Sequence, residues 1–335
     1  MSNYWRYTVL MLAMVAVGCR SDTSSPAFRV GLITPGSIAD AAWNSGAYQG
    51  LTYIHDSLGV DVSHVEAKTP GAQEEALRTY AAQGYDLVFG HGFEFQDMAE
   101  RVALEYPETV FIITSGIRTV GQVAPMIFRL EEASYLAGMV AGGMTQTGII
   151  GFVGGIELPP IRSAYDGWVN GARAVNPAVE PRLIYINTFE DAAAGREAAL
   201  ALIRLGADMI HHNADAAALG VFQAVKESPA VYVFGANADQ SALAPDRVLG
   251  SAVIDLPRAF VAVAREVVDG TFTPRVESFG LASGVIRYAM NPKTTPLIPT
   301  ALSARIAAAE DSISRGLLNP TLVPAPDPVP ASATP

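Results

Sequence analysis

The chain has 335 residues, of which half are hydrophobic and 16% are charged, and its formal net charge is −11. This composition excludes an intrinsically disordered chain, and it disfavours nucleic-acid binding, because affinity for phosphates comes from clustered basic side chains. The single cysteine excludes an internal disulfide bond and a cysteine-based zinc site.

The first 27 residues predict export. Residues 1–18 combine one basic residue, Arg6, with an uncharged stretch from Tyr7 to Val17, which is typical of a secretory signal peptide. Cys19 follows directly, and the sequence Ala16-Val17-Gly18-Cys19 resembles a bacterial lipobox. We therefore expect acylation of Cys19, with residues 19–27 as a polar tether to the lipid bilayer. Plain secretion with an incidental cysteine is the alternative.

Short apolar runs then alternate with amphipathic stretches. The predicted strands span 28–34, 60–66, 86–89, 109–113, 148–153, 183–187, 209–212, 231–235 and 248–253. The predicted helices span 40–58, 72–83, 95–106, 132–144, 161–175, 192–205, 216–226 and 256–269. Apolar runs without polar alternation favour parallel strands buried on both faces, and the strand–helix order indicates an α/β fold. A single barrel and two open sheets in two lobes both satisfy this order.

The C-terminal end differs from the rest of the chain. Residues 320–335 include six prolines in 16 residues. Because proline lacks a backbone donor, we expect residues 319–335 to form a solvated, disordered tail.

Polar and glycine residues follow many of the predicted strands. Examples are Gly90-His91-Gly92-Phe93, Thr114-Ser115-Gly116 and Gly235-Ala236-Asn237. Ligands bind at the carboxyl ends of strands in open α/β sheets, so these turns favour a binding cleft. Ordinary turns use the same residue types, which is the competing interpretation.

Motifs of the common enzyme classes were not found. The sequence has no phosphate-binding Gly-x-x-x-x-Gly-Lys-Ser/Thr loop, no Gly-x-Ser-x-Gly elbow and no His-Glu-x-x-His. His211 and His212 are adjacent in a predicted strand, so they point to opposite faces and cannot share one metal ion. We expect neither a metal nor a cofactor.

The chain from Val30 to about Gly284 resembles the basic membrane protein (BMP) family. These are substrate-binding lipoproteins of ABC transporters, and they include purine-nucleoside-binding lipoproteins. The most specific segments are Glu132–Gly142 (EASYLAGMVAG), Thr147–Gly155 (TGIIGFVGG), Pro159–Arg162 (PPIR) and Gly171–Pro177 (GARAVNP), in that order.

The resemblance implies a two-lobed, periplasmic-binding-protein-like fold of type I, with a parallel sheet flanked by helices in each lobe. One lobe would hold residues 28–127 and 255–283, and the other 130–247 and 286–318. The chain would cross between the lobes near Phe128, Val248 and Val285. A ligand would bind between the lobes and close them by hinge motion.

The resemblance also implies ligand-binding residues. The family motif Asp-x-x-Phe-Asn matches Asp40, Trp43 and Asn44, where the aromatic ring would stack on the ligand and the amide would form hydrogen bonds. The other residues expected to bind the ligand are Phe93, Ser115, His212, Asn237 and Gly284.

Several polar positions depart from the family pattern. An aspartate expected to meet the base is Ser115 here, and an aspartate expected to clamp the ribose hydroxyls is Asn237. A frequent lysine is replaced by Ile254, and a glycine-rich turn is replaced by His211–Asp215. A carboxylate accepts two donors, whereas an amide accepts with its oxygen and donates with its nitrogen. The identity of the ligand therefore stays open.

The sequence thus predicts a monomeric, lipid-anchored solute-binding protein facing the periplasm or the cell exterior. It would deliver a small aromatic polar ligand, a nucleoside or nucleobase, to an ABC permease in the membrane. One alternative is a sensing module that presents its ligand to a membrane receptor. Another is an enzyme acting on nucleosides, in which only His91, His211 and His212 could titrate; the loss of acidic residues argues against it.

Overall fold

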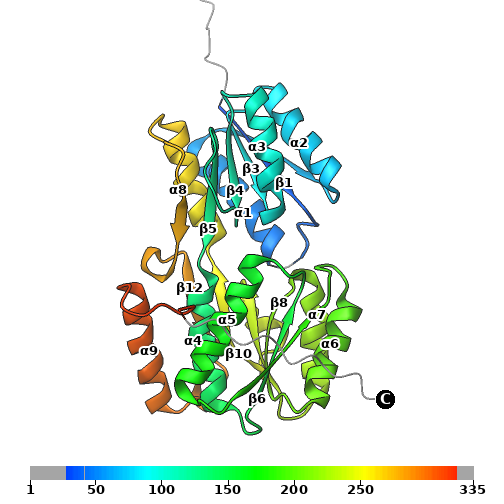
Figure 1. Ribbon diagram of the computed structural model, residues 1–335, viewed down its shortest axis with the longest axis vertical. Helices are drawn as coiled ribbons and strands as arrows, with labels where there is room; N and C mark the ends of the chain where they lie inside the picture. The colour runs from blue at the N-terminus through cyan, green and yellow to red at the C-terminus, as the bar shows by residue number, and fades with distance from the viewer. Residues whose placement is uncertain (1–27, 41, 323–335) are drawn as a thin grey trace, which may run out of the picture.

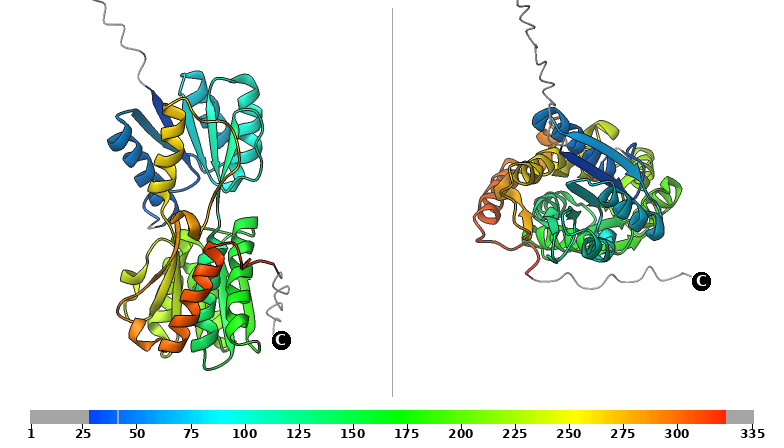
Figure 2. Two further views of the ribbon diagram at one scale, coloured as in Figure 1. Left: turned by 90° about the vertical axis from the view of Figure 1, so that its left-hand side faces the viewer. Right: turned by 90° about the horizontal axis from the view of Figure 1, so that it is seen from above.

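The computed structural model describes residues 28–40 and 42–322, which form two α/β lobes stacked end to end (Figure 1). The predicted signal peptide, Cys19, the tether up to residue 27 and residues 323–335 of the predicted tail lie outside the described residues. Figure 2 shows the two lobes joined through a narrower central region.

The first lobe contains a six-stranded sheet in the order β11-β5-β4-β3-β1-β2, and all its strand pairs are parallel. Its strands are β1 (Arg29–Thr34), β2 (Asp61–Glu66), β3 (Leu87–His91), β4 (Val110–Thr114), β5 (Val123–Phe128) and β11 (Glu277–Phe279). Helices pack in pairs on its two faces (Figures 1 and 2): α1 (Trp43–Leu58) with α8 (Leu256–Val268), and α2 (Pro70–Ala82) with α3 (Gln96–Glu105).

The second lobe contains a six-stranded sheet in the order β12-β10-β9-β8-β6-β7, in which only β12 is antiparallel to its neighbour. Its strands are β6 (Ile149–Gly154), β7 (Glu180–Tyr185), β8 (Met209–Asn213), β9 (Tyr232–Asn237), β10 (Val248–Ile254) and β12 (Ile286–Met290). Its helices are α4 (Leu130–Met144), α5 (Pro159–Val175), α6 (Ala192–Arg204), α7 (Ala218–Glu227) and α9 (Thr300–Ser314).

Burial explains why these segments form central strands. Every residue of β3 and of β10 is buried, as expected when helices cover both faces of a parallel sheet. Aspartates begin two of the flanking helices: Asp191 caps α6, and Asp255 caps α8, each accepting bonds from backbone N–H groups. The predicted α/β, two-lobed fold is confirmed, and the single-barrel alternative is wrong. Of the helices within the described residues, none combines the length and apolar character needed to cross a membrane.

Glycines allow α4 and α5 to pack with their backbones in contact. A Cβ atom at Gly138 or Gly142 of α4 would overlap the backbone of α5, and one at Gly167 or Gly171 of α5 would overlap the backbone of α4. Any side chain at these positions would force the helices apart. This packing accounts for the glycines in the family-like segments of both helices.

The chain crosses between the lobes after β5, after β10 and after β11. The second crossover lies at Asp255, not near Val248 as the sequence predicted. Residues 248–254, which the predicted lobe boundaries left unassigned, pair with β9 and β12, with an irregularity between Val248 and Gly250, and so belong to the second sheet.

Buried hydrogen bonds tie the first and third crossovers together. The backbone N–H of Arg129 donates to the carbonyl oxygen of Phe279 at 2.8 Å. The carboxylate of Glu132 accepts the backbone N–H of Leu281 at 2.6 Å and lies 2.8 Å from the guanidinium of Arg129. Two connections that lie about 150 residues apart in sequence therefore form one bonded unit.

Candidate functional site

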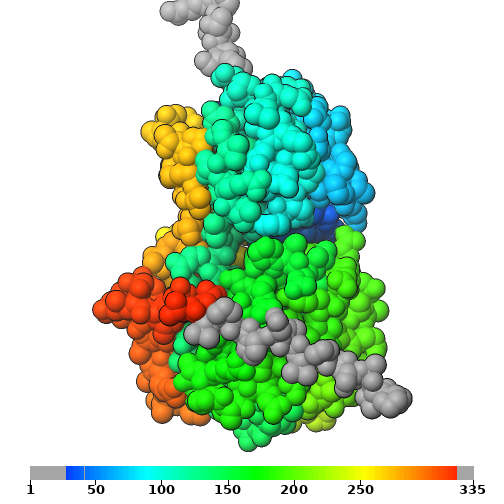
Figure 3. Space-filling view, viewed as in Figure 1, coloured from blue at the N-terminus to red at the C-terminus, as the bar shows by residue number. Residues whose placement is uncertain are grey.

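A cavity of about 650 Å³ lies between the two lobes. The first lobe contributes residues that follow β1, β3, β4 and β5, and the second lobe contributes residues that follow β6, β7, β8 and β9. The carboxyl ends of both sheets therefore face one space, which is the usual position of a ligand in open α/β folds. In the space-filling view the two lobes meet along a seam (Figure 3).

Trp43, the first residue of α1, lines the cavity and is half-buried. One face of its indole stacks on the ring of His91, with ring centroids 4.0 Å apart, and Phe128 meets it edge to face at 6.0 Å. Burial lowers the pKa of His91 to about 3, so this imidazole is neutral. His91 covers one face of the indole and Phe128 packs against the ring, so a ligand can stack only on the surface that these two rings leave open to the cavity.

Asp40 lines the cavity, and its carboxylate is held by N–H groups at the start of α1. One of its carboxylate oxygens accepts backbone bonds from Ala42 and Ser45, and the other accepts the backbone N–H and the side-chain Nδ2 of Asn44 at 2.6 and 2.9 Å. The carboxylate thus satisfies N–H groups at the start of α1. It also fixes the amide of Asn44, whose Oδ1 is buried and has no hydrogen-bond partner among the described residues.

Asn237 and Asp215 form a hydrogen-bonded pair on the wall of the second lobe. Asn237 Nδ2 donates to Asp215 Oδ1 at 2.9 Å and lies 3.4 Å from Asn213 Oδ1. Both members of the pair adopt left-handed backbone conformations, with φ of 66° and 47°, as does Ser115 of the first lobe with φ of 59°. Such conformations are uncommon for residues other than glycine, and aspartate and asparagine tolerate them best.

Asp215 is an acid of the cavity whose pKa is strongly raised. Burial, with smaller repulsion from Asp40 and Glu94, raises its pKa to about 8, and the bond from Asn237 only partly opposes this shift. Glu94 is exposed to the cavity but enclosed by the cleft walls, and this desolvation raises its pKa as well. The family's acidic positions are lost at Ser115 and Asn237, but the cavity holds acidic side chains at other positions.

Aromatic rings line the cavity from both lobes. Phe93 follows β3 on the first lobe, and Phe189 follows β7 on the second. Gly155 makes room for Phe189, because a Cβ atom there would overlap the ring. With Trp43, these rings give both walls apolar surface suited to a flat ligand.

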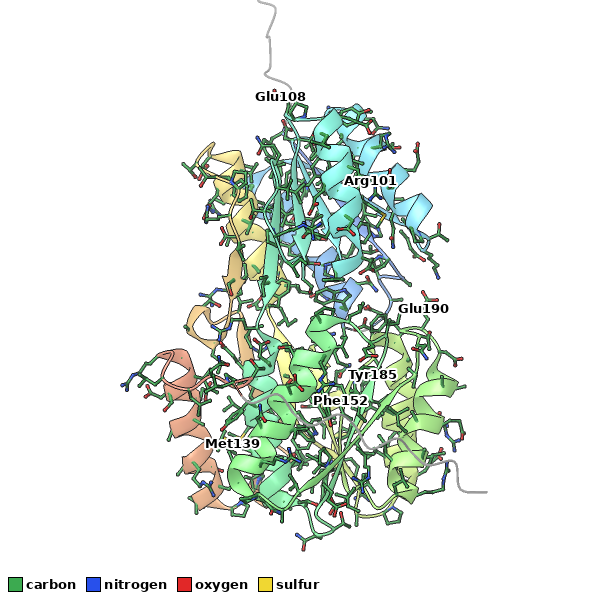
Figure 4. All side chains as sticks on the ribbon, viewed as in Figure 1. Arg101, Glu108, Met139, Phe152, Tyr185 and Glu190 are labelled. Atoms are coloured by element: carbon green, nitrogen blue, oxygen red, sulfur yellow. The ribbon has the colours of Figure 1, made fainter. Side chains whose placement is uncertain are left out.

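An ion pair closes one edge of the cavity. Lys68 Nζ of the first lobe lies 3.1 Å from Glu190 Oε1 of the second and 3.3 Å from Glu66 Oε1. Figure 4 shows Glu190 at the edge of the second lobe that faces the first. Both partners are more than half exposed, so the pair contributes little stability. It does show that the lobes approach each other across the cavity.

Two of the predicted ligand-binding residues lie away from the cavity. His212 is buried inside β8, where its Nε2 lies 3.0 Å from Gln240 Oε1 and its ring packs edge to face on Phe222. Gly284 is exposed at the third crossover, with φ of 69°. His91 and His211 are fully buried as well, so none of the histidines proposed as catalytic bases lines the cavity.

The structure brings the other predicted residues together around the cavity: Asp40, Trp43, Asn44, Phe93, Ser115 and Asn237. The sequence analysis missed Lys68, Glu94, Phe189, Glu190 and Asp215. Glu94 and Asp215 lie in the turns that come after the predicted strands 86–89 and 209–212, so their positions could have been inferred. The contribution of Phe189 and Glu190 depends on how the loop after β7 folds.

Comparisons with known proteins identify relatives that match most of this chain. Residues 27–304 match the Bmp family, described as "ABC transporter substrate-binding protein PnrA-like". Basic membrane protein A1 of Borrelia garinii is 28% identical over 324 residues, 94% of each chain. A purine-binding protein of Brucella abortus is 28% identical over 295 residues, 87% of this chain and 82% of its own. An ABC transporter solute-binding protein from Aeropyrum pernix has the same fold, with a TM-score of 0.81 at 23% identity, over 90% of this chain and 94% of its own.

Proposed function

Because this chain belongs to the Bmp family of PnrA-like ABC transporter substrate-binding proteins, we propose that it binds a nucleoside or nucleobase between its lobes and delivers it to an ABC permease. The lobes would move as two bodies about the three crossovers, trapping the ligand on closure. The protein would act as a monomer.

The observation that carries this proposal is the cavity between two aromatic walls. Its volume of about 650 Å³ suits a small molecule. Trp43 and Phe93 on one lobe and Phe189 on the other can contact a flat ring system, and stacking of a base on an aromatic side chain is worth about 1–3 kcal/mol. The purine-binding relative supports a purine among the possible rings.

A thermal-shift screen of purine and pyrimidine nucleosides, free bases, sugars and vitamins tests the ligand class. A ligand at 100 times its Kd should add about 2.7 kcal/mol to the free energy of unfolding. We expect nucleosides or bases to give the largest rise in Tm, with calorimetric Kd values in the micromolar range or tighter. Stabilisation by sugars alone would contradict the proposal.

We propose that the ligand is released unchanged. Asp215 and Glu94 could titrate in the cavity, so the enzyme alternative has its own test. Chromatography of a nucleoside panel after prolonged incubation with the protein should recover every nucleoside intact. A base or sugar product that increases with protein concentration would establish catalysis.

We also propose that Cys19 anchors the protein to the membrane, facing the periplasm or the cell exterior. Cys19→Ser should move the protein from the membrane fraction to the soluble fraction and abolish labelling by radioactive palmitate. Unchanged membrane association of this variant would refute the anchor.

A further inference from the structure

Each wall of the cavity carries a polar side chain with unused acceptor capacity. On the first lobe, the Asp40 carboxylate can only accept, so it fixes the Asn44 amide with Nδ2 toward itself. Within the part of the chain that the structure describes, the amide oxygen of Asn44 is left buried without a partner. A ligand N–H or O–H group would remove the cost of that unsatisfied acceptor.

Asp215 provides the matching acceptor on the second lobe. Its side chain lines the cavity, the residue is only 8% exposed, and Asn237 supplies a single 2.9 Å bond to one of its oxygens. A carboxylate can accept about four bonds, so most of its capacity is unused. Asn237 has already committed its amide donor to this bond, so here it positions Asp215.

The charges around the cavity disfavour an anionic ligand. Four acidic side chains line it: Asp40, Glu94, Glu190 and Asp215. Among the described residues, Lys68 is the one basic side chain in its lining, and Glu66 and Glu190 already hold its ammonium group. A phosphate group would therefore meet carboxylates without a free cation to balance it.

We propose that Asp215 determines the specificity of this cavity: together with Asn44 across the cleft, it binds N–H or O–H donors of an unphosphorylated nucleoside or base and excludes the phosphorylated forms. This inference rests on the proposed function. A ligand that donates to both residues also links the two lobes, so the same contacts that select it favour closure.

Calorimetric titration of the full chain in mild detergent tests this inference, with adenosine, adenine and adenosine 5′-monophosphate as probes. Asp215→Asn keeps the side-chain shape and an oxygen for Asn237 but removes the charge. At pH 8.5, where the wild-type carboxylate is mostly ionised, Asp215→Asn should weaken adenosine or adenine binding about tenfold or more. Glu108→Gln, an exposed charge change at the far end of the first lobe (Figure 4), should leave binding unchanged. Adenosine 5′-monophosphate should bind wild type at least tenfold more weakly than adenosine.

The pH profile separates the proposed role from a structural one. Donors from the ligand favour the ionised carboxylate, so wild-type affinity should rise between pH 6 and pH 8.5, and that rise should be absent in Asp215→Asn. The charged groups that face Asp215 are Asp40 and Glu94 on the opposite lobe, beside the uncharged Asn213 and Asn237 on its own. Glu94→Gln should therefore keep the pH dependence.

The outcomes distinguish this inference from the proposed function. If Asp215→Asn binds adenosine as tightly as wild type does, or if wild type binds adenosine 5′-monophosphate as tightly as adenosine, the role of Asp215 is overturned and the proposed function still stands. No binding of any probe by wild type contradicts both. If wild type prefers adenosine to adenine, the donor groups are the ribose hydroxyls; if it binds both with equal affinity, they belong to the base. Either result supports the inference when the affinity is also lower in Asp215→Asn.

Discussion

Replacement of Trp43 tests whether its indole forms the stacking wall of the cavity. Trp43→Ala removes a ring that lines the cavity and packs on His91 at 4.0 Å. Loss of stacking on a base, at about 1–3 kcal/mol, corresponds to about 5- to 150-fold weaker binding. Because the ring is half-buried, the free energy of unfolding should also fall by about 2 kcal/mol, less than the 3–5 kcal/mol typical of a fully buried aromatic side chain.

Trp43→Phe is the matched control, because phenylalanine keeps an aromatic face. Its affinity should fall by less than about fivefold. Fluorescence adds a second readout: once residues 1–18 are removed, the tryptophans of the chain are Trp43 and Trp168, and Trp168 is fully buried in the second lobe. Nucleoside binding should quench wild-type emission, and the quench should disappear in Trp43→Phe although the ligand still binds.

The reasoning fails if Trp43→Ala binds nucleosides with wild-type affinity while remaining folded in circular dichroism. It also fails if Trp43→Phe retains the full ligand-induced quench, since the signal would then come from another tryptophan.

Three further predictions concern stability and closure. In the wild type, the folded chain keeps a proton on Asp215, whose pKa is raised to about 8, whereas the unfolded chain releases it above pH 4, so the free energy of unfolding should fall from pH 4 to pH 7. Asp215→Asn should remove this fall, so in chemical denaturation its stability relative to wild type should be greater at pH 7 than at pH 4. A difference from wild type that stays the same from pH 4 to pH 7 would refute the raised pKa. Gly171→Leu should lower the free energy of unfolding by about 3 kcal/mol or more or prevent folding, since its side chain would overlap the backbone at Tyr135, whereas Gly71→Ala, with open space around it, should be neutral. Glu190→Gln should speed ligand release in stopped-flow measurements at low salt, with little difference from wild type at high salt, because it removes the Lys68 contact across the cleft; an equal effect at both salt concentrations would argue against an electrostatic role.

Much of the fold could be predicted because burial leaves a strong pattern in the sequence. Uninterrupted apolar runs such as Leu87–Phe89 are expected only where helices cover both faces of a sheet. Strand β5 was missed, since its central residue Pro125 is rarely found inside a sheet. The short β11 was missed too, because three residues carry too little periodicity to be detected.

The site was predicted less well, because its geometry depends on where each strand ends. His212 belongs to the pairing part of β8 and points into the packing against α7, whereas Asp215 lies just beyond the strand and reaches the cavity. A shift of two or three residues along a strand decides between core and cleft. The hydrogen bond from Asn237 to Asp215 joins the end of β9 to the turn after β8 and has no signature in either segment alone.

A crystal structure of the protein grown with adenosine tests the central claim most directly. The account predicts the nucleoside between the lobes, with its base against the free face of Trp43 and donor groups within 3.2 Å of Asn44 Oδ1 and Asp215. Adenosine bound outside this cavity, or inside it with no contact to either residue, would contradict the account.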